Sequence, residues 1–280
     1  MSEDLSLRAL LSSTKLNPAD AKILMAHVLE THYQLPRSAL LSRDDMLLNT
    51  EAMADWKALE ARRIRGEPIA YLVGKRGFHN IELHVASGVL IPRPETELLV
   101  EIGLCEIKRL SAPTKILDLG TGSGAIALAI AHESPTTQVI ATDQSIDALD
   151  IAKKNAELLE VTSRVAFFQG SWYTALNGDE SFDIILSNPP YIAAQDPHLS
   201  QGDLRFEPVS ALTDHGSGLS CLEKIISGAQ QHLKPNGLLA VEHGFDQSQA
   251  VVALMQSTGF REIQTHQDFG GHYRVASARK

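Results

Sequence analysis

Four residues in the second half of the chain, Asn188-Pro189-Pro190-Tyr191, combine groups that could hold a planar polar substrate. They follow a short apolar run, Phe182–Leu186, that is typical of a buried strand. Neither proline can donate a backbone hydrogen bond and both fix φ, so the chain must leave the strand in a stiff corner. The corner carries three acceptors, the Asn188 side-chain oxygen and the carbonyls of Asn188 and Pro189, beside the Tyr191 ring. We predict a site for an NH2 group; the alternative is an ordinary strand exit, with Asn188 as a turn residue and Tyr191 in the core.

A glycine-rich turn upstream, Gly120-Thr121-Gly122-Ser123-Gly124, lies between a predicted strand and the start of a predicted helix. Glycines in such a turn let the backbone approach a ligand closely before the chain enters the helix. The pattern predicts a nucleotide-like cofactor at this turn.

Asp143 ends the next predicted strand, about twenty residues further on, where a carboxylate can accept both hydroxyls of a ribose. The turn also fits a loose dinucleotide fingerprint, so a nicotinamide-dependent dehydrogenase is an alternative. The additional Gly124 and the position of Asp118, just before the turn, count against that alternative.

The composition is that of an ordinary globular chain. Its 280 residues are 44% hydrophobic and 21% charged, enough for one large domain or two modest ones. No apolar run reaches the length of a membrane span, and Met1-Ser2-Glu3-Asp4 begins no apolar signal segment. Two cysteines imply no disulfide framework, and the 11 histidines show no metal-ligand spacing. We expect a cytoplasmic protein without a metal.

The acidic net charge of −9 is unevenly distributed. Residues 1–85 hold 11 basic and 11 acidic side chains, which leaves 14 basic and 23 acidic ones in the remainder. Because an acidic surface repels the phosphate backbone, the balance argues against nucleic acid as the main partner.

Three segments with different patterns follow one another. Residues 1–66 predict a small helical bundle, residues 67–92 a β-hairpin linker with strands at Tyr71–Gly74 and Ile81–Val85, and residues 93–280 an α/β domain. The alternation of strands and helices in the last segment demands a mostly parallel sheet covered on both faces. The strands are expected at Lys115–Leu119, Gln138–Thr142, Arg164–Phe168, Phe182–Leu186, Gly237–Val241, Glu262–His266 and Tyr273–Ala278.

These stretches resemble a known family. The G-x-G-x-G turn after Asp118 resembles motif I of class I S-adenosylmethionine-dependent methyltransferases, which have a Rossmann-like, seven-stranded, mostly parallel sheet. The string Asn188–Tyr191 after such a turn is similar to that of methyltransferases acting on adenine N6 or glutamine N5. Gly66–Leu72, Ile91–Glu97 and Gly202–Pro208 narrow the resemblance to the peptide chain release factor glutamine methyltransferases, the PrmC/HemK family.

The resemblance implies S-adenosylmethionine as methyl donor, S-adenosylhomocysteine as product and the glutamine of the release factor Gly-Gly-Gln loop as acceptor. It implies that residues 1–66 help to dock the release factor and that residues 93–280 bind the cofactor. The cofactor residues would be Gly120, Thr121, Gly122, Ser123, Gly124, Asp143, Trp172 and Asn188. We expect a monomer that binds neither membranes nor, stably, nucleic acid.

One aromatic residue, Trp172, and one polar residue, Ser171, are expected at the adenine. Trp172 can stack on the ring, an interaction of about 1–3 kcal/mol for a base on an aromatic side chain; the alternative is a lid over the sheet edge. Ser171 stands where many relatives carry an aspartate, and a hydroxyl is a weaker acceptor for the adenine amine.

For catalysis we expect Asn188, Pro189, Pro190 and Tyr191 to act together. The Asn188 side-chain oxygen and the Pro189 carbonyl would accept the two N–H bonds of the target glutamine, and Tyr191 would pack against the amide plane. Arg205, further on, is expected to brace the structure by pairing with Asp203 or Glu207. The alternatives are an adenine-N6 methyltransferase on DNA or RNA and a non-catalytic partner-binding protein.

Overall fold

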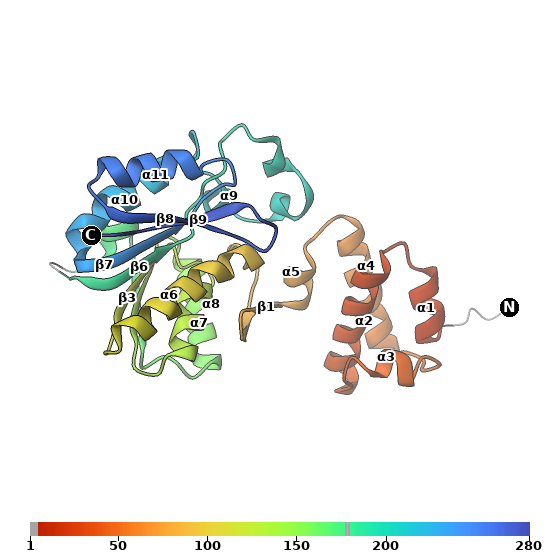
Figure 1. The fold of residues 1–280 in the computed structure, drawn as a ribbon. Coiled ribbons are helices and arrows are strands. Elements are labelled where there is room, and N and C mark those ends of the chain that lie inside the picture. The colour runs from red at the N-terminus through yellow and green to blue at the C-terminus, as the bar shows by residue number, and fades with distance from the viewer. Residues whose placement is uncertain (1–4, 177, 179) are drawn as a thin grey trace. The chain divides into compact units, whose positions relative to one another are not determined.

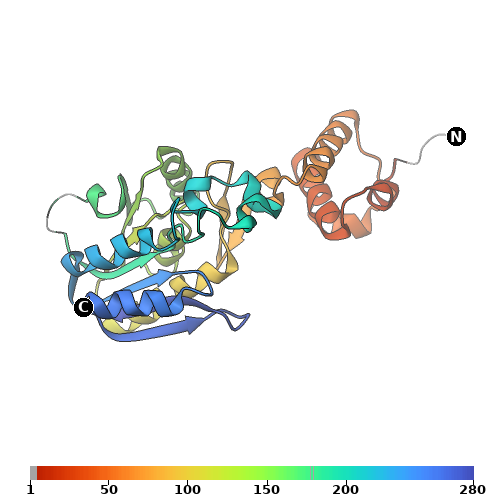
Figure 2. The ribbon, with the colours of Figure 1, turned by 90° about the horizontal axis from the view of Figure 1, so that it is seen from above.

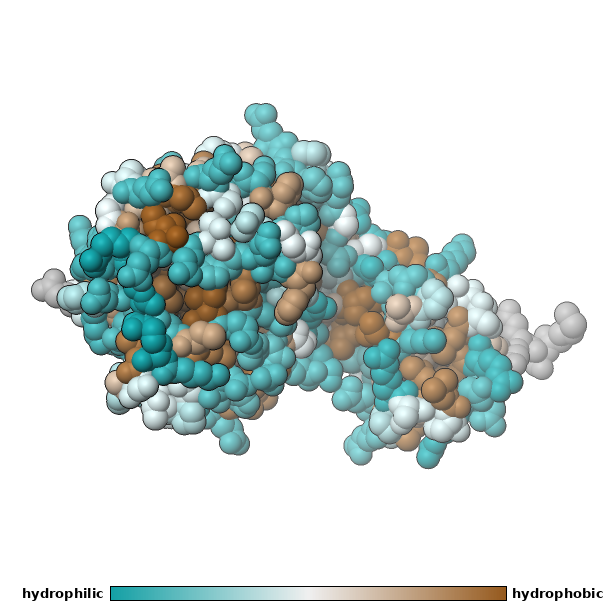
Figure 3. All heavy atoms as spheres, in the orientation of Figure 1, coloured by the Kyte–Doolittle hydropathy of each residue, from teal (hydrophilic) through white to brown (hydrophobic). Residues whose placement is uncertain are grey.

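The computed structural model describes residues 5–176, 178 and 180–280. They divide into two compact units between Gly74 and Lys75 (Figure 1). Hydrophilic residues dominate the face of each unit drawn in Figure 3, with apolar patches between them. Within the described residues, no helix combines the length and the apolar character that crossing a membrane requires.

The first unit is helical. Its helices are α1 (Leu7–Ser13), α2 (Pro18–Tyr33), α3 (Ala39–Ser42), α4 (Thr50–Ile64) and α5 (Ile69–Val73). The two long helices begin alike, because Asn17 accepts a hydrogen bond from the backbone of Asp20 at 2.9 Å and Asn49 accepts one from Ala52 at 2.8 Å. Caps of this kind stabilise a helix by about 1 kcal/mol. The helices close over a core that includes Leu24, Met25 and Trp56.

The predicted first strand of the linker is wrong. The segment Ile69–Val73 is the short helix α5, which starts after Pro68 and ends at Gly74 with φ of 77°. The hairpin instead pairs β1 (Lys75–Phe78) with β2 (Ile81–His84), antiparallel. Tyr71, Leu72 and Val73 have side chains that suit a strand, but a proline at the start of a helix and a left-handed glycine at its end outweigh that preference.

The second unit contains a seven-stranded sheet in the order β5-β4-β3-β6-β7-β9-β8. The strands from β3 to β7 pair in parallel, and β9 is antiparallel to both of its neighbours. All of the predicted strands of this sheet are present, so the predicted fold class is confirmed. Their bounds are β3 (Lys115–Leu119), β4 (Gln138–Asp143), β5 (Val165–Gln169), β6 (Phe182–Ser187), β7 (Leu233–Glu242), β8 (Arg261–Gln267) and β9 (Tyr273–Arg279).

Helices cover both faces of this sheet (Figures 1 and 2). Residues of α6, α7 and α8 pack on one face, and residues of α10 and α11 pack on the other. The α-helices are α6 (Glu97–Leu110), α7 (Ala125–Glu133), α8 (Ile146–Leu158), α9 (Val209–Leu212), α10 (Ser220–His232) and α11 (Ser248–Ser257). The 3-10 helices are η1 (Pro94–Thr96), η2 (Trp172–Ala175), η3 (Pro197–Ser200) and η4 (Gly202–Phe206).

The strand order reverses between β3 and β6, and this switch point positions the site. The register pairs Leu119, the last residue of β3, with Ser187, the last residue of β6. The Ser187 hydroxyl also donates to the Leu119 carbonyl at 2.7 Å. The glycine turn at Gly120 and the corner at Asn188 therefore leave the sheet side by side, where open α/β sheets bind their ligands.

Candidate active site

A cavity of ≈ 600 Å³ lies at the switch point, and all of its lining residues belong to the second unit. Its volume is in the range of small-molecule and cofactor sites. Most of the predicted cofactor residues line it: Gly120, Thr121, Gly122, Ser123, Asp143, Trp172 and Asn188. Of the other predicted residues Pro190 lines it, whereas Gly124, Pro189 and Tyr191 are not among its lining residues.

The glycine turn is held in a left-handed conformation, with φ of 73° at Gly120, 56° at Gly122 and 89° at Gly124. The backbone N–H groups of Gly120 and Thr121 both donate to the Thr142 carbonyl at 2.9 Å, which fixes the turn on β4. A Cβ at Gly120 would lie 3.3 Å from the Trp172 ring, so the absent side chain makes room for the indole. Gly124 instead caps α7, where a Cβ would lie 2.6 Å from Leu128 Cδ1.

Asp143 lies at the end of β4 and lines the cavity. Its Oδ2 accepts from the backbone of Gly122 and its Oδ1 from that of Ser145, both at 2.9 Å. Burial raises the pKa of Asp143, and these backbone hydrogen bonds oppose the rise. Each carboxylate oxygen can accept more than one hydrogen bond. The remaining lone pairs fit the hydroxyls of a ribose, so the chemistry of this residue suits an adenosine cofactor.

Asp118 precedes the turn and is completely buried. Its Oδ2 accepts from the Thr121 hydroxyl at 2.6 Å and from the backbone of Ala127 at 3.1 Å, which ties the turn to the start of α7. Burial raises the pKa of Asp118 to about 7, against the lowering effect of these two donors. The carboxyl therefore belongs to the support of the turn.

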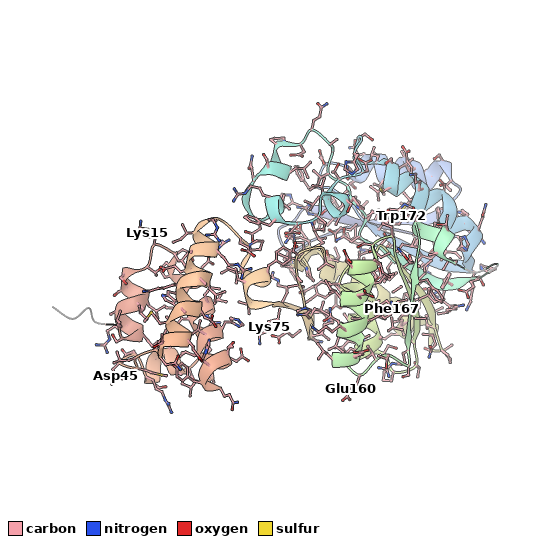
Figure 4. The ribbon with its side chains drawn as sticks, turned by 180° about the vertical axis from the view of Figure 1, so that it is seen from behind. Lys15, Asp45, Lys75, Glu160, Phe167 and Trp172 are labelled. Carbon is pink, nitrogen blue, oxygen red and sulfur yellow. The ribbon has the colours of Figure 1, made fainter. Side chains whose placement is uncertain are left out.

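Trp172 starts η2, directly after β5 and the residues Gly170 and Ser171 (Figure 4). Its φ of 51° is unusual for a bulky residue. The ring lies against the glycine turn and packs on the core of the sheet, and both Trp172 and Ser171 line the cavity. An aromatic wall at this place fits an adenine, and the stacking stays a prediction.

The Asn188 corner is oriented by a residue far away in the sequence. Asn188 Nδ2 donates to the hydroxyl of Thr96, at the end of η1, at 2.9 Å. Among the described residues no hydrogen-bond donor to Asn188 Oδ1 is found. The carboxamide thus uses its NH2 group inside the protein and keeps its oxygen for a ligand, as the predicted role requires.

Tyr191 braces the corner rather than lining the cavity. Its hydroxyl donates to Glu242 Oε1 at 3.0 Å, and its carbonyl accepts from Gln247 Nε2 at 2.9 Å. Burial, together with the Glu242 carboxylate, raises the pKa of Tyr191 above its usual range, so the ring stays neutral. The predicted packing of Tyr191 on the substrate amide stays a prediction.

Thr96 and Glu242 are the residues of this network that we did not predict. Thr96 lies in the stretch Ile91–Glu97, whose two glutamates are explained by a helix start, so the pattern of the stretch indicates no separate role for Thr96. Glu242 ends the apolar strand β7 and is only 1% exposed. A carboxylate at the end of a buried strand, next to the ends of β3 and β6, was the signal that could have identified it.

An ion pair joins the stretches that carried the family resemblance. Arg93 Nη2 contacts Glu207 Oε1 at 2.6 Å, and the Glu207 side chain is fully buried. The expected pairing of Arg205 is wrong, because its Nε donates to the Gly202 carbonyl at 3.1 Å instead. Arg93 lines the cavity, so this ion pair holds one of its walls.

Asn155, on α8, connects the hairpin to the glycine turn. Its Nδ2 donates to the carbonyls of His84 at 3.0 Å and Ser123 at 2.9 Å, and its Oδ1 accepts from the His84 backbone at 2.7 Å. The side chain is 1% exposed. Every polar atom of this buried amide is therefore engaged, which fixes β2 and the turn relative to each other.

The described part of the chain holds no group of three or more His, Cys, Asp or Glu side chains that could bind a metal ion. The polar side chains that line the cavity include carboxylates, amides and hydroxyls as well as the cations Arg93 and Lys224, a mixture that suits an organic ligand with several polar groups.

The fold and the site define a class I methyltransferase. Residues 96–205 match the family model of the methyltransferase small domain. The 16S rRNA N2 G1207 methyltransferase of T. thermophilus has a similar fold, with a TM-score of 0.54 at 20% identity over 74% of this chain and 49% of that one.

The chain belongs to the release factor glutamine methyltransferase family. It is 45% identical over 274 residues to the Burkholderia pseudomallei release factor glutamine methyltransferase, covering 96% of this chain and 94% of the relative. The enzyme of that name from Xylella fastidiosa strain Temecula1 is 47% identical over 268 residues, with 96% and 95% covered. Residues 6–74 match the PrmC N-terminal domain. The predicted family is confirmed.

Proposed function

We propose that this protein transfers a methyl group from S-adenosylmethionine to the side-chain amide nitrogen, N5, of the glutamine in the Gly-Gly-Gln motif of peptide chain release factors. The family supports the reaction and the substrate. The observation that carries the chemistry is the Asn188 carboxamide, whose NH2 group is bound to Thr96 while its oxygen has no donor in the described chain. We further propose that the enzyme acts as a monomer in the cytoplasm, where translation takes place.

An amide nitrogen is a weak nucleophile because its lone pair is delocalised into the carbonyl. The Asn188 oxygen and the Pro189 carbonyl accept its two N–H bonds and turn the lone pair toward the methyl donor. Positive charge grows on the nitrogen during attack, so both acceptors bind the transition state more tightly than the ground state. The stiff double-proline corner keeps these oxygens in place before the substrate arrives.

The cofactor supplies an electrophilic methyl group on a sulfonium, whose departure leaves a neutral thioether. Asp143 would hold the ribose and Trp172 the adenine. The glycine turn would lie against the remainder, because Gly120 and Gly122 line the cavity without side chains. After the transfer the nitrogen loses its additional proton easily, so no general base is needed at this site.

The family favours a protein substrate over the adenine base that is the main alternative. Both targets present an NH2 group on a planar, conjugated carbon, so the Asn188 corner alone does not separate them. The helical residues 6–74, which match the PrmC N-terminal domain, support a docking role of the first unit toward a release factor.

Mass spectrometry of the substrate tests the proposal. The full chain is incubated with methyl-labelled S-adenosylmethionine and an unmethylated release factor, and the digested Gly-Gly-Gln peptide is analysed. We expect one methyl group on the glutamine side chain and none on a release factor whose motif glutamine is replaced by alanine. A DNA duplex and a transfer RNA serve as competing acceptors. Label on their adenines, with none on the release factor, would refute the proposal.

A further inference from the structure

We propose that an aromatic patch beside the active site docks the release factor, so that affinity for the substrate protein comes from residues outside the catalytic cavity. The aromatic patch consists of Phe245, Phe269 and Tyr273, together with His272 and Arg274. None of these residues lines the cavity. The proposal deepens the proposed function and rests on it.

Exposed aromatic side chains are concentrated in this patch. Phe269 is fully exposed, and Phe245 and Tyr273 are 62% and 44% exposed. Among the described residues, these are the three most exposed Phe, Tyr and Trp side chains. Aromatic residues are enriched at protein interfaces, where a few large anchors carry most of the binding energy. Their concentration at one place therefore indicates a surface that a partner covers.

The aromatic patch lies at the edge of the sheet where the catalytic corner leaves it. Ser187 of β6 pairs with Val241 of β7, and Val241 pairs with Ala276 of β9. The corner at Asn188, the loop at Phe245 and the turn between β8 and β9 therefore all lie at this end of the sheet (Figure 1). Neighbouring strands are about 4.8 Å apart, so β9 lies about 10 Å from β6.

The turn between β8 and β9 is held in a defined shape. Asp268 Oδ1 accepts from the backbone of His272 at 3.0 Å, and Asp268 Oδ2 accepts from Arg274 Nε at 3.2 Å. The Arg274 guanidinium lies 5.7 Å from the centre of the Phe245 ring, and the His272 ring lies 6.0 Å from it. These contacts join the turn to Phe245 and present the backbone of Phe269 at a fixed place, which lowers the entropic cost of binding.

The size of a protein substrate favours the release factor as the occupant. Two of the three residues in the Gly-Gly-Gln motif are glycines, so the motif offers the cavity a single side chain. Specific protein interfaces bury about 800 Å² on each partner, which corresponds to a disc with a radius of about 16 Å. A release factor whose glutamine reaches Asn188 therefore covers the surface out to β9. We expect an apolar face beside its glutamine loop to contact the aromatic patch.

Binding of the intact release factor to the full chain tests the proposal. Isothermal titration of unmethylated release factor in the presence of S-adenosylhomocysteine gives the Kd, and kinetics with saturating S-adenosylmethionine give KM and kcat. The variants are Phe269→Ser, Phe269→Tyr and a double variant that combines Phe245→Ser with Phe269→Ser. Because Phe269 is fully exposed, its replacement should leave the fold intact. Melting temperatures check this for each variant.

Leu158→Ser is the matched control. Leu158 is 65% exposed and is the last residue of α8. Because α8 joins the parallel strands β4 and β5, it runs back along the sheet and ends at the opposite edge. The control therefore removes exposed apolar surface at a place that a protein bound at the cavity does not reach.

We expect Phe269→Ser to raise the Kd and the KM for the release factor by roughly tenfold, as the loss of one aromatic anchor does, and the double variant to raise them further. The kcat at saturating release factor should stay within about twofold, because docking contacts are equal in the ground and transition states. Phe269→Tyr keeps the ring and should hold the Kd within about threefold of the wild type. Leu158→Ser should leave every value unchanged.

The outcomes separate this proposal from the proposed function. If the wild type methylates the release factor and both serine variants bind it as tightly as the wild type does, only the docking role fails. If these variants lower kcat at saturation and leave KM unchanged, the patch does not dock the substrate and the role fails as well. A dimer that Phe269→Ser dissociates would make the patch a contact between two copies and overturn the proposal. If the wild type methylates no release factor, the proposed function fails, and this proposal with it.

Discussion

The glycine turn and the Asn188 corner leave the sheet side by side, yet they are built in opposite ways. The turn is held mainly by its own neighbourhood, through left-handed glycines and hydrogen bonds to the end of the adjacent strand β4. The corner depends on side chains from distant segments, Thr96 on one side and Glu242 on the other. We infer that cofactor binding is encoded locally, whereas the orientation of the catalytic amide depends on long-range contacts.

The largest expected effect comes from removing the amide of the corner. Asn188→Ala should lower kcat by roughly 10²–10³, as the loss of one preorganised polar group does. The cofactor Kd should change little, because the turn that holds the cofactor does not depend on this amide. Steady-state kinetics with a saturating release factor, together with calorimetry of cofactor binding, measure the two effects. Near-normal turnover would remove Asn188 from its assigned role.

The second prediction removes a side chain from the cofactor turn and not from the Asn188 corner. Asp143→Ala should weaken cofactor binding by roughly 10–100-fold, since it removes hydrogen bonds to a charged group and unties Gly122 and Ser145. With saturating cofactor, kcat should remain close to that of the wild type. Isothermal titration gives the Kd. An unchanged Kd together with a reduced kcat would contradict the division between the two regions.

The pH dependence of turnover probes the long-range half of the comparison. Burial raises the pKa of Glu242 to about 7, so the carboxyl is charged above that pH and neutral below it. Because the charged carboxylate accepts the hydrogen bond from the Tyr191 hydroxyl more strongly than the neutral form and so holds the corner more firmly, kcat should fall as the pH falls through about 7. A group with that pKa is about nine-tenths neutral one unit lower, so kcat should drop about tenfold. A flat kcat between about pH 8 and 6, measured with both substrates saturating, would contradict this.

The last prediction concerns stability and not turnover, and it compares two glycines of the turn. Gly122→Ala adds a Cβ with no atom within 4 Å and φ of 56°, so it should cost only the strain of a left-handed residue, about 1–2 kcal/mol of unfolding free energy. Gly124→Ala adds a Cβ 2.6 Å from Leu128 Cδ1 at φ of 89°, which should cost roughly 1–3 kcal/mol more. Midpoints of urea unfolding compare the two variants, and equal losses would show that crowding at Gly124 is relieved.

The sequence contained most of the fold and the local half of the site. Strands such as Lys115–Leu119 show as short apolar runs, and the glycines and Asp143 stand at fixed spacing along the chain. Helix α5 could not be predicted from its own residues, because Tyr71, Leu72 and Val73 have side chains that suit strands. The flanking proline and glycine determine the helical backbone conformation there. The roles of Thr96 and Glu242 could not be predicted because their hydrogen-bond partners lie far away in the sequence. Only the register of β3, β6 and β7 brings those partners together.

The amide of Asn155 has a practical consequence for hybrid enzymes. It ties the hairpin strand β2 to the carbonyl of Ser123, so the hairpin and the cofactor turn form one inseparable part. A chimera that receives a foreign docking unit should be spliced at Gly74, because this splice keeps the hydrogen bonds between Asn155, His84 and Ser123. A graft spliced beyond His84 would replace the strand β2 that the Asn155 amide binds. The hydrogen bonds of Asn155 to His84 would then be lost, and the exchange of the docking unit would also disturb the cofactor turn at Ser123.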